Sequence, residues 1–174
     1  MQIDIEPLPE TGRPFAHTYA PAELSLEDER ARLRGDVRVA GHARRKGRRV
    51  QVAGTVETEV EVNCDRCLAP VNVPLRAEFD VSYEPAEAAE ADEHAELHDE
   101  DLAASVYEGD RLDVDELVRE QIMLALPARS LCREACRGLC PTCGQDLNAQ
   151  ACACEQKEID PRWAGLAAIK SSDE

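Results

Sequence analysis

Two runs of alternating apolar and polar residues constrain the fold of this 174-residue chain more than any other feature. Apolar side chains stand at even positions over residues 50–62 and at odd positions over residues 71–83. A period of two places one set of side chains on each face of a pleated strand. The runs therefore predict an antiparallel hairpin with one buried face, which reverses at Cys64-Asp65-Arg66-Cys67. Pro74 lacks an amide donor, so we expect it at an open edge or a bulge.

Weaker patterns on both sides of the hairpin add further elements. Residues 3–5 predict a short edge strand, residues 37–41 another strand, and residues 106–107 a short strand. Residues 22–34 predict a short helix with Leu26 and Leu33 turned inward and Leu24 on the solvated face. A second helix is predicted over residues 114–126.

The start and the end of that second helix carry clear signals. Asp113 followed by Glu116 has the pattern of a capping box, and Pro127 stops the helix. Its apolar residues recur at helical spacing, so we expect it to cover the apolar face of the sheet. The predicted fold class is α+β: an antiparallel β-sheet body with one packed helix (residues 1–127) and a Cys-rich zinc-knuckle tail (residues 128–174).

Charge is distributed unevenly along the chain. The net charge of -16 argues against a nonspecific polyanion binder, although a local basic patch is compatible with it. Nine of the eighteen residues from 84 to 101 are acidic, and none is Lys or Arg. We expect a disordered, solvated insert there; the alternative is a tether for a basic partner such as a ribosomal protein. Residues 44–49 are basic, and are either a solvated turn or a contact with RNA phosphate.

No apolar run is long enough to cross a membrane, and the first residues lack the pattern of a secretory signal. These observations predict a cytoplasmic protein with no membrane partner. The eight cysteines are then expected to be reduced, and their close pairing indicates metal binding more than disulfides.

The tail contains the most specific of these cysteine patterns. Cys140-Pro-Thr-Cys143-Gly144 has the form of a zinc knuckle, in which both thiolates reach one ion. We expect Gly144 to let backbone amides point back at the sulfurs. Cys152 and Cys154 can complete a tetrahedral site. Four thiolates leave no open position, so Cys140, Cys143, Cys152 and Cys154 predict a structural zinc site.

The other four cysteines allow a second site. Cys64 and Cys67 are again knuckle-spaced, and Cys132 and Cys136 are separated by one helical turn. A second site built from these four would join the hairpin to the tail. A competing partition sends Cys132 or Cys136 to the first site and leaves other thiols free. A redox role for Cys64 and Cys67 is less favoured, because such a pair usually opens a helix and strands flank this one.

Four arginines accompany these cysteines. Arg129, Arg133 and Arg137 recur every four residues, and Arg66 lies inside the first Cys-x-x-Cys pair. If the tail docks on the hairpin, they can form one basic surface that faces RNA. Alternatively, they balance the negative charge of zinc held by four thiolates.

Several segments together resemble the YceD family, the large ribosomal RNA subunit accumulation proteins. They are Cys64-Asp-Arg-Cys67-Leu68, Glu120-Gln-Ile-Met-Leu-Ala-Leu-Pro127, Cys136-Arg-Gly-Leu-Cys140-Pro-Thr-Cys143-Gly144 and Asp160-Pro-Arg-Trp163. Their order and spacing are more specific than any single segment, and the resemblance runs from about residue 37 to 169. It implies a bacterial or plastid-type protein needed for accumulation of large-subunit ribosomal RNA, and it does not imply an enzyme.

The leading functional prediction is therefore a noncatalytic assembly factor that binds large-subunit ribosomal RNA or a ribosomal protein. The alternative is an acidic adaptor that captures a basic ribosomal protein without touching RNA. An enzyme is disfavoured, because no catalytic triad order, phosphate-binding glycine loop or suitably spaced carboxylate pair stands out. No small-molecule substrate is expected.

Overall fold

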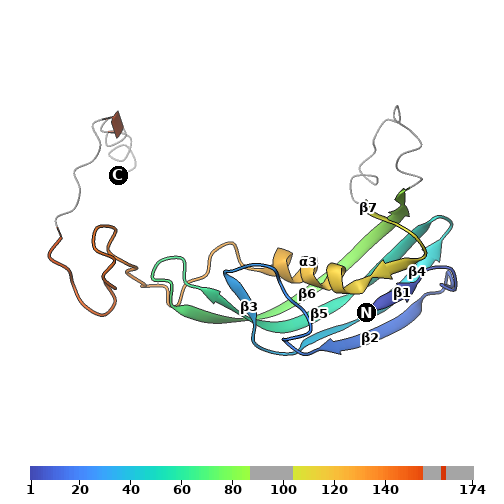
Figure 1. Cartoon of the computed structure of the whole chain (residues 1–174), viewed down its shortest axis with the longest axis horizontal. Helices are drawn as coiled ribbons and strands as arrows, with labels where there is room; N and C mark the ends of the chain where they lie inside the picture. Colours follow the sequence, from blue (N-terminus) through green and yellow to red (C-terminus); the bar gives the residue numbers. More distant parts are fainter. Residues whose placement is uncertain (87–103, 155–161, 164–174) are drawn as a thin grey trace, which may run out of the picture.

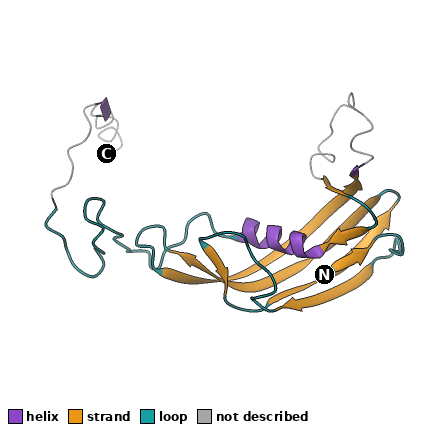
Figure 2. Cartoon of the chain, viewed as in Figure 1, coloured by secondary structure: helices purple, strands orange, loops and turns teal. Residues whose placement is uncertain are grey.

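The computed structural model describes residues 1–86, 104–154 and 162–163. A curved sheet forms the body, one helix lies along its concave side, and the Cys-rich tail extends beyond one end (Figure 1). The described secondary structure is mostly strand (Figure 2). The named elements are β1 (Gln2–Asp4), β2 (Arg13–Tyr19), β3 (Ala31–Leu33), β4 (Val37–Lys46), β5 (Arg49–Asn63), β6 (Pro70–Pro85), β7 (Ala104–Tyr107), β8 (Arg111–Asp113) and α3 (Val114–Ala125).

The central hairpin is the one that the alternation predicts. β5 and β6 pair antiparallel from Val50–Tyr83 to Asn63–Pro70. The valines at even positions of β5 are buried against the helix side, whereas most odd-position residues of β6 are half-buried. In the described sheet, β6 has a second neighbour only over Ser82–Pro85, so Pro74 lies on an open edge, as predicted.

Neighbouring strands widen this hairpin into a six-stranded sheet. Its order is β2-β4-β5-β6-β7, and β3 pairs with β5. A separate two-stranded sheet, β1-β8, forms where Ile3 lies opposite Leu112. The predicted strands at residues 3–5 and 37–41 are therefore present, although Ile5 lies just beyond β1 and is buried there.

The prediction of a helix over residues 22–34 is wrong. Leu24 and Leu26 are buried without helical structure, and Ala31–Leu33 forms β3. Glu27 has a φ of 54°, which is incompatible with a right-handed helix. β4 stops pairing with β5 at Glu57, so the edge of β5 from Val60 to Val62 is free to pair with β3. Strand pairing prevails here over a weak helical pattern.

The sheet is also not purely antiparallel, because β7 pairs in parallel with β6. A parallel pair needs a long crossover of roughly a dozen residues or more, and the acidic segment supplies that length. Glu84 and Pro85, which we expected in the disordered insert, instead continue β6. Residues 87–101 of that predicted insert lie outside the described residues. The division into residues 1–127 and 128–174 stays a prediction.

The predicted helix is confirmed as α3, with Asp113 as its N-cap. The Asp113 carboxylate accepts from the backbone N–H groups of Asp115 and Glu116 at 2.9 and 3.4 Å. α3 lies against β1, β5 and β6 and buries Val114, Leu117, Val118 and Ile122. Burial of each such side chain stabilises the fold by roughly 1.5–3 kcal/mol.

Two glycines allow β4 and β5 to approach closely under an aromatic ring. Gly41 and Gly54 lie opposite each other, and Gly54 lies opposite Phe79 of β6. A Cβ at Gly54 would lie 3.0 Å from the Phe79 ring and would overlap the Ala40 carbonyl. The absence of a side chain at Gly54 therefore makes room for the buried ring, and its absence at Gly41 lets β4 and β5 approach each other.

Candidate metal centres

The eight thiols gather into two groups of four. Cys64, Cys67, Cys132 and Cys136 form what we name the hairpin cluster. Cys140, Cys143, Cys152 and Cys154 form the tail cluster. Within each cluster all sulfur atoms lie within 4.8 Å of one another, so each cluster could hold a metal ion. The structure thus brings together the two sets that the sequence suggested; their role as metal ligands stays a prediction.

The hairpin cluster begins in the turn between β5 and β6. The backbone N–H of Cys64 donates to the Ala69 carbonyl at 2.8 Å, and that of Leu68 donates to the Cys64 carbonyl at 2.9 Å. Leu68 has a φ of 61°, which is uncommon for a residue other than glycine, and its side chain is exposed. This tight turn brings Cys67 back beside Cys64.

The tail docks on this turn through polar contacts. Asp65 and Ser130 exchange two hydrogen bonds: the Asp65 N–H donates to the Ser130 carbonyl at 2.9 Å, and the Ser130 N–H donates to Asp65 Oδ2 at 2.6 Å. The Leu139 N–H donates to the Arg66 carbonyl at 3.0 Å. Gly138, with a φ of 75°, lies so close to Arg66 that a Cβ there would be 2.8 Å from its carbonyl oxygen. These contacts place the tail cysteines beside the hairpin cysteines.

The sulfur geometry of the hairpin cluster suits a tetrahedral ion. Cys64 Sγ lies 3.9 Å from Cys136 Sγ, and Cys67 Sγ lies 3.6 Å from Cys132 Sγ. Tetrahedral metal–sulfur bonds of about 2.3 Å require sulfurs about 3.8 Å apart. A disulfide would bring them to about 2.05 Å, and all eight cysteines are free thiols. Cys64 and Cys136 are buried, whereas Cys67 is half-buried and Cys132 is exposed.

The tail cluster is organised around Cys140. Its backbone N–H donates to the Gln145 carbonyl at 2.8 Å, and its sulfur accepts from the Thr142 N–H at 3.4 Å. Gly144 has the positive φ of 73° that this turn requires. The expected contact of a backbone amide with a sulfur is present at Thr142, whereas the Gly144 N–H itself donates to the Cys140 carbonyl at 2.9 Å.

In the hairpin cluster the pKa is lowered for two thiols and raised for two, and in the tail cluster the pKa of Cys140 is lowered and that of Cys154 is raised. Backbone N–H groups of Cys132 and Cys67 lower the pKa of Cys64 to about 6, and those of Cys143 and Thr142 lower the pKa of Cys140 to about 6. The neighbouring Cys67 thiol raises the pKa of Cys132 to about 12. Four crowded thiols cannot all ionise without a compensating cation, so a metal ion matches the chemistry of both clusters.

The four arginines predicted to contact RNA differ in their contacts. Arg66 Nη1 donates to the Cys136 carbonyl at 2.6 Å, and Arg133 Nη2 donates to Asn148 Oδ1 at 2.8 Å. Arg129 and Arg137 are exposed, and neither side chain forms an ion pair within the described ranges. Arg66 therefore joins the hairpin turn to the tail and Arg133 links two parts of the tail, which the spacing of the arginines alone did not predict.

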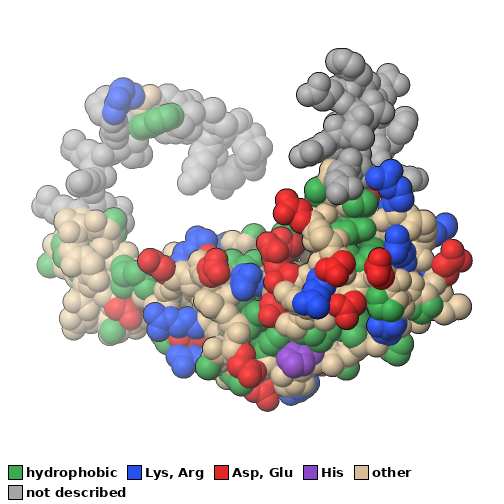
Figure 3. All heavy atoms as spheres, turned by 45° about the vertical axis from the view of Figure 1, so that its right-hand side comes forward, with side chains coloured by type: hydrophobic (Ala, Val, Ile, Leu, Met, Phe, Trp, Pro, Cys, Tyr) green, Lys and Arg blue, Asp and Glu red, His purple; other side chains and the backbone are tan. Residues whose placement is uncertain are grey.

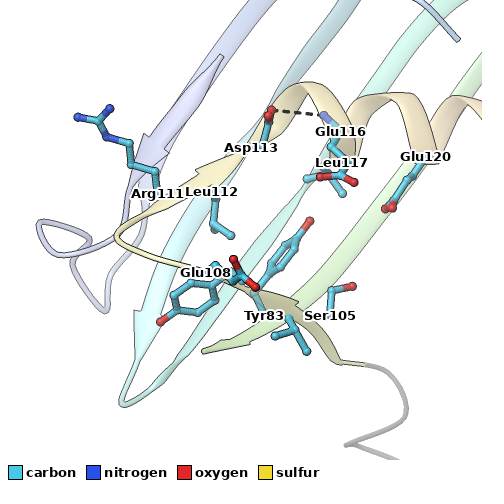
Figure 4. Close-up of a pocket in the computed structure, with 11 residues that line it drawn as sticks. Tyr83, Ser105, Glu108, Arg111, Leu112, Asp113, Glu116, Leu117 and Glu120 are labelled. Carbon is cyan, nitrogen blue, oxygen red and sulfur yellow. Dashed lines mark hydrogen bonds between the residues drawn. The ribbon is translucent and has the colours of Figure 1, made fainter. Parts of the chain in front are cut away.

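A separate cavity of about 270 Å³ lies between α3, β7 and the end of β6. Tyr83 contributes a half-buried ring, and carboxylates of Glu116 and Glu120 project from α3 on the same side (Figure 4). Burial, followed by the charges of Glu120 and Glu116, raises the pKa of Tyr83 to about 12. Figure 3 shows Asp and Glu side chains interspersed with Lys and Arg side chains over the surface of the body. Four carboxylates and one guanidinium, that of Arg111, line the cavity, so its net charge is negative.

Three functional candidates were missed by the sequence reasoning. Asp65 and Ser130 join the hairpin to the tail, and Asn148 contacts Cys136. Asp146-Leu147-Asn148 carries a local signal, because Asx side chains often bond the backbone two residues on, as Asp146 does to the Asn148 N–H at 2.8 Å. Nothing in that signal indicated a contact with a thiol.

The fold and the site together define a mixed β-sheet protein with two candidate four-thiol metal centres. In the part of the chain that is described, no helix has the length and apolar character needed to cross a bilayer. The family model for the large ribosomal RNA subunit accumulation protein YceD matches residues 52–170, and the chain belongs to this family.

Relatives of this chain occur in bacteria and plants. It is 33% identical over 152 residues to an uncharacterised protein of Mycobacterium tuberculosis, which covers 85% of this chain and 69% of that protein. It is 27% identical over 168 residues to YlbN of Bacillus subtilis, covering 96% and 93%. It is 24% identical over 169 residues to a chloroplastic large ribosomal RNA subunit accumulation protein homologue of Zea mays, covering 84% and 56%. No solved structure matches.

Proposed function

We propose that this protein is a noncatalytic factor for the accumulation of large-subunit ribosomal RNA and thus for assembly of the large ribosomal subunit. The observation that carries the proposal is the family match over residues 52–170. That range includes most of the central hairpin, α3 and all eight cysteines.

The second part of the proposal is that both clusters hold structural zinc. The donor sets contain only sulfur, which suits zinc and other thiophilic metals and disfavours magnesium or calcium. Cys64, Cys67, Cys132 and Cys136 would hold one ion, and Cys140, Cys143, Cys152 and Cys154 the other. Four protein ligands would close each coordination sphere, which is typical of a structural site.

Metal analysis of the purified chain tests this part. After dialysis we expect about two zinc ions per chain and few titratable thiols, since each cluster supplies four ligands. Less than one zinc per chain, together with freely titratable thiols, would contradict the zinc proposal. Iron in place of zinc would keep the structural role and change the metal.

Cells that lack the protein test the assembly role. We expect fewer large-subunit particles and less large-subunit RNA relative to small-subunit RNA, and rescue by the wild-type chain. A Cys64→Ser/Cys136→Ser variant removes two buried ligands of the hairpin cluster and should rescue poorly. An unchanged subunit profile in the deletion strain would refute the assembly role.

The acidic cavity favours one alternative, an adaptor that captures a basic ribosomal protein without touching RNA. Carboxylates beside an aromatic ring suit a guanidinium or ammonium side chain. A Glu116→Gln/Glu120→Gln variant would then lose binding to basic ribosomal proteins, in a salt-sensitive manner, and the wild-type chain would yield no RNA crosslinks. RNA crosslinks that include Arg129 or Arg137 would instead support RNA contact by the tail.

A further inference from the structure

Asn148 lies in the loop between two cysteines of the tail cluster and uses both ends of its side-chain amide. Its Nδ2 lies 3.4 Å from Cys136 Sγ, a thiol of the hairpin cluster, and 2.8 Å from Asp146 Oδ1. Its Oδ1 accepts from the backbone N–H of Arg137 at 2.9 Å and from Arg133 Nη2 at 2.8 Å. Most of these partners belong to the segment that supplies two ligands of the hairpin cluster.

In the sequence, the loop that carries Asn148 is flanked by two cysteines of the tail cluster. Cys143 precedes this loop and Cys152 follows it. Inside the loop, the Leu147 N–H donates to the Gly138 carbonyl at 2.9 Å, so the loop folds back towards the hairpin cluster. A metal ion in the tail cluster would hold both ends of this loop, and with them the position of Asn148.

We propose that the two metal sites bind cooperatively and that Asn148 is the positioning residue that couples them. This inference rests on the proposal that both clusters hold zinc. Filling the tail cluster orders the loop, and the loop then presents Nδ2 to the Cys136 thiolate, where the N–H group stabilises negative charge on a metal ligand. Coupling of affinities is reciprocal, so metal in the hairpin cluster strengthens binding in the tail cluster by the same factor.

Titration of the reduced, metal-free full chain with cobalt(II), followed by competition with zinc, tests the coupling. Two variants isolate the sites: Cys143→Ser/Cys154→Ser removes the tail site, and Cys67→Ser/Cys132→Ser removes the hairpin site. Contacts around metal ligands commonly change affinity by roughly 10- to 100-fold. We expect the product of the two site affinities in the wild type to exceed the product from the isolated sites by at least 10-fold. Equal products would overturn the coupling.

Substitutions of Asn148 test its role. Asn148→Ala should weaken the hairpin site by roughly 10- to 100-fold when the tail site is filled and leave it unchanged when the tail site is removed. Asn148→Asp should weaken it at least as much, because a carboxylate accepts from Arg137 and Arg133 but cannot donate to sulfur. Gln150→Ala, in the same loop and exposed, is the control. An unchanged affinity in Asn148→Ala, or an equal loss in Gln150→Ala, would overturn the role of Asn148.

The outcomes separate this inference from the zinc proposal. A wild-type chain that binds neither cobalt nor zinc would contradict the zinc proposal itself. Two filled but independent sites would contradict only the coupling. Circular dichroism of the sheet checks that each variant is folded, and if Asn148→Ala does not fold, the comparison of wild type with the two cysteine variants still decides whether the sites are coupled.

Discussion

Tyr19 and Asp115 join two parts of the chain that are far apart in sequence. Tyr19 is buried, and its hydroxyl donates to Asp115 Oδ1 at 2.6 Å. Burial, followed by this hydrogen bond, raises the pKa of Tyr19 above its ordinary value. The folded chain therefore holds the phenolic proton more tightly than the unfolded chain does. The resulting stability is fully present below about pH 10 and is lost as pH rises through the folded pKa.

Tyr19→Phe removes this hydrogen bond and the titration together. At neutral pH we expect a loss of about 1 kcal/mol in the free energy of unfolding, because the partner Asp115 is partly exposed and can be rehydrated. Above pH 10 the difference from wild type should shrink, since only the wild type loses the contribution of Tyr19. Urea unfolding between pH 7 and 11 measures both effects.

Tyr83→Phe is the matched control for that experiment. The pKa of Tyr83 is also raised, but its hydroxyl has no hydrogen-bond partner among the described residues. We therefore expect Tyr83→Phe to leave the free energy of unfolding nearly unchanged at neutral pH. At alkaline pH this variant should lose less stability than the wild type, because it lacks the titration of Tyr83. A difference between wild type and Tyr19→Phe that stays constant from pH 7 to 11 would contradict the assignment to Tyr19.

Among the elements, α3 has one face buried against the sheet and one face exposed to solvent. Ile122 is 1% exposed at the sheet, whereas Leu124, two residues further on, is 78% exposed. Val118 and Leu117 extend the buried side towards the N-cap. The contacts of α3 with β5 and β6 make it the cover of the sheet and the wall of the acidic cavity.

Ile122→Asp should unfold the body. A carboxylate at this position would be buried without a partner, which costs several kcal/mol and is a large part of the stability of a typical domain. Leu124→Asp is the control and should change the free energy of unfolding by less than about 0.5 kcal/mol, because that side chain faces water. Thermal unfolding followed by circular dichroism distinguishes them, and equal melting temperatures would refute the placement of α3.

At the scale of the whole molecule, the tail and the body are stabilised by different interactions. The body buries a continuous cluster of aliphatic side chains from the sheet, α3 and the N-terminal segment. The tail over residues 128–154 contains no helix or strand of its own beyond one isolated bridge, Leu139–Asp146. Its order depends on turn hydrogen bonds, on contacts with the hairpin turn and, in our proposal, on metal.

Removal of metal should therefore release the tail and spare the sheet. With a strong chelator we expect trypsin to cut rapidly after Arg129, Arg133 and Arg137, while the circular dichroism of the sheet is retained. Arg76 in β6 is the internal control, because its bond is protected by the hairpin with or without metal. Mass spectrometry of the fragments measures the cuts; the same digestion pattern with and without chelator would contradict metal-dependent order in the tail.

The sequence was sufficient for features that depend on neighbours along the chain. The alternation of β5 and β6, the Asp113 cap and the stop at Pro127 are local patterns with direct physical causes. The partition of the cysteines was one of several that spacing allowed. Spacing sets which thiols can share an ion, but it does not set which distant pair lies beside them.

The tertiary structure decided the features that depend on contacts between distant segments. Ala31–Leu33 becomes a strand because β5 extends beyond the end of β4, and β7 joins in parallel because the edge of β6 is open there. Cys132 and Cys136 reach Cys64 and Cys67 because Asp65 and Ser130 dock the tail on the hairpin turn. Local propensities are weak compared with pairing and burial, and only the folded chain shows which partners are in reach.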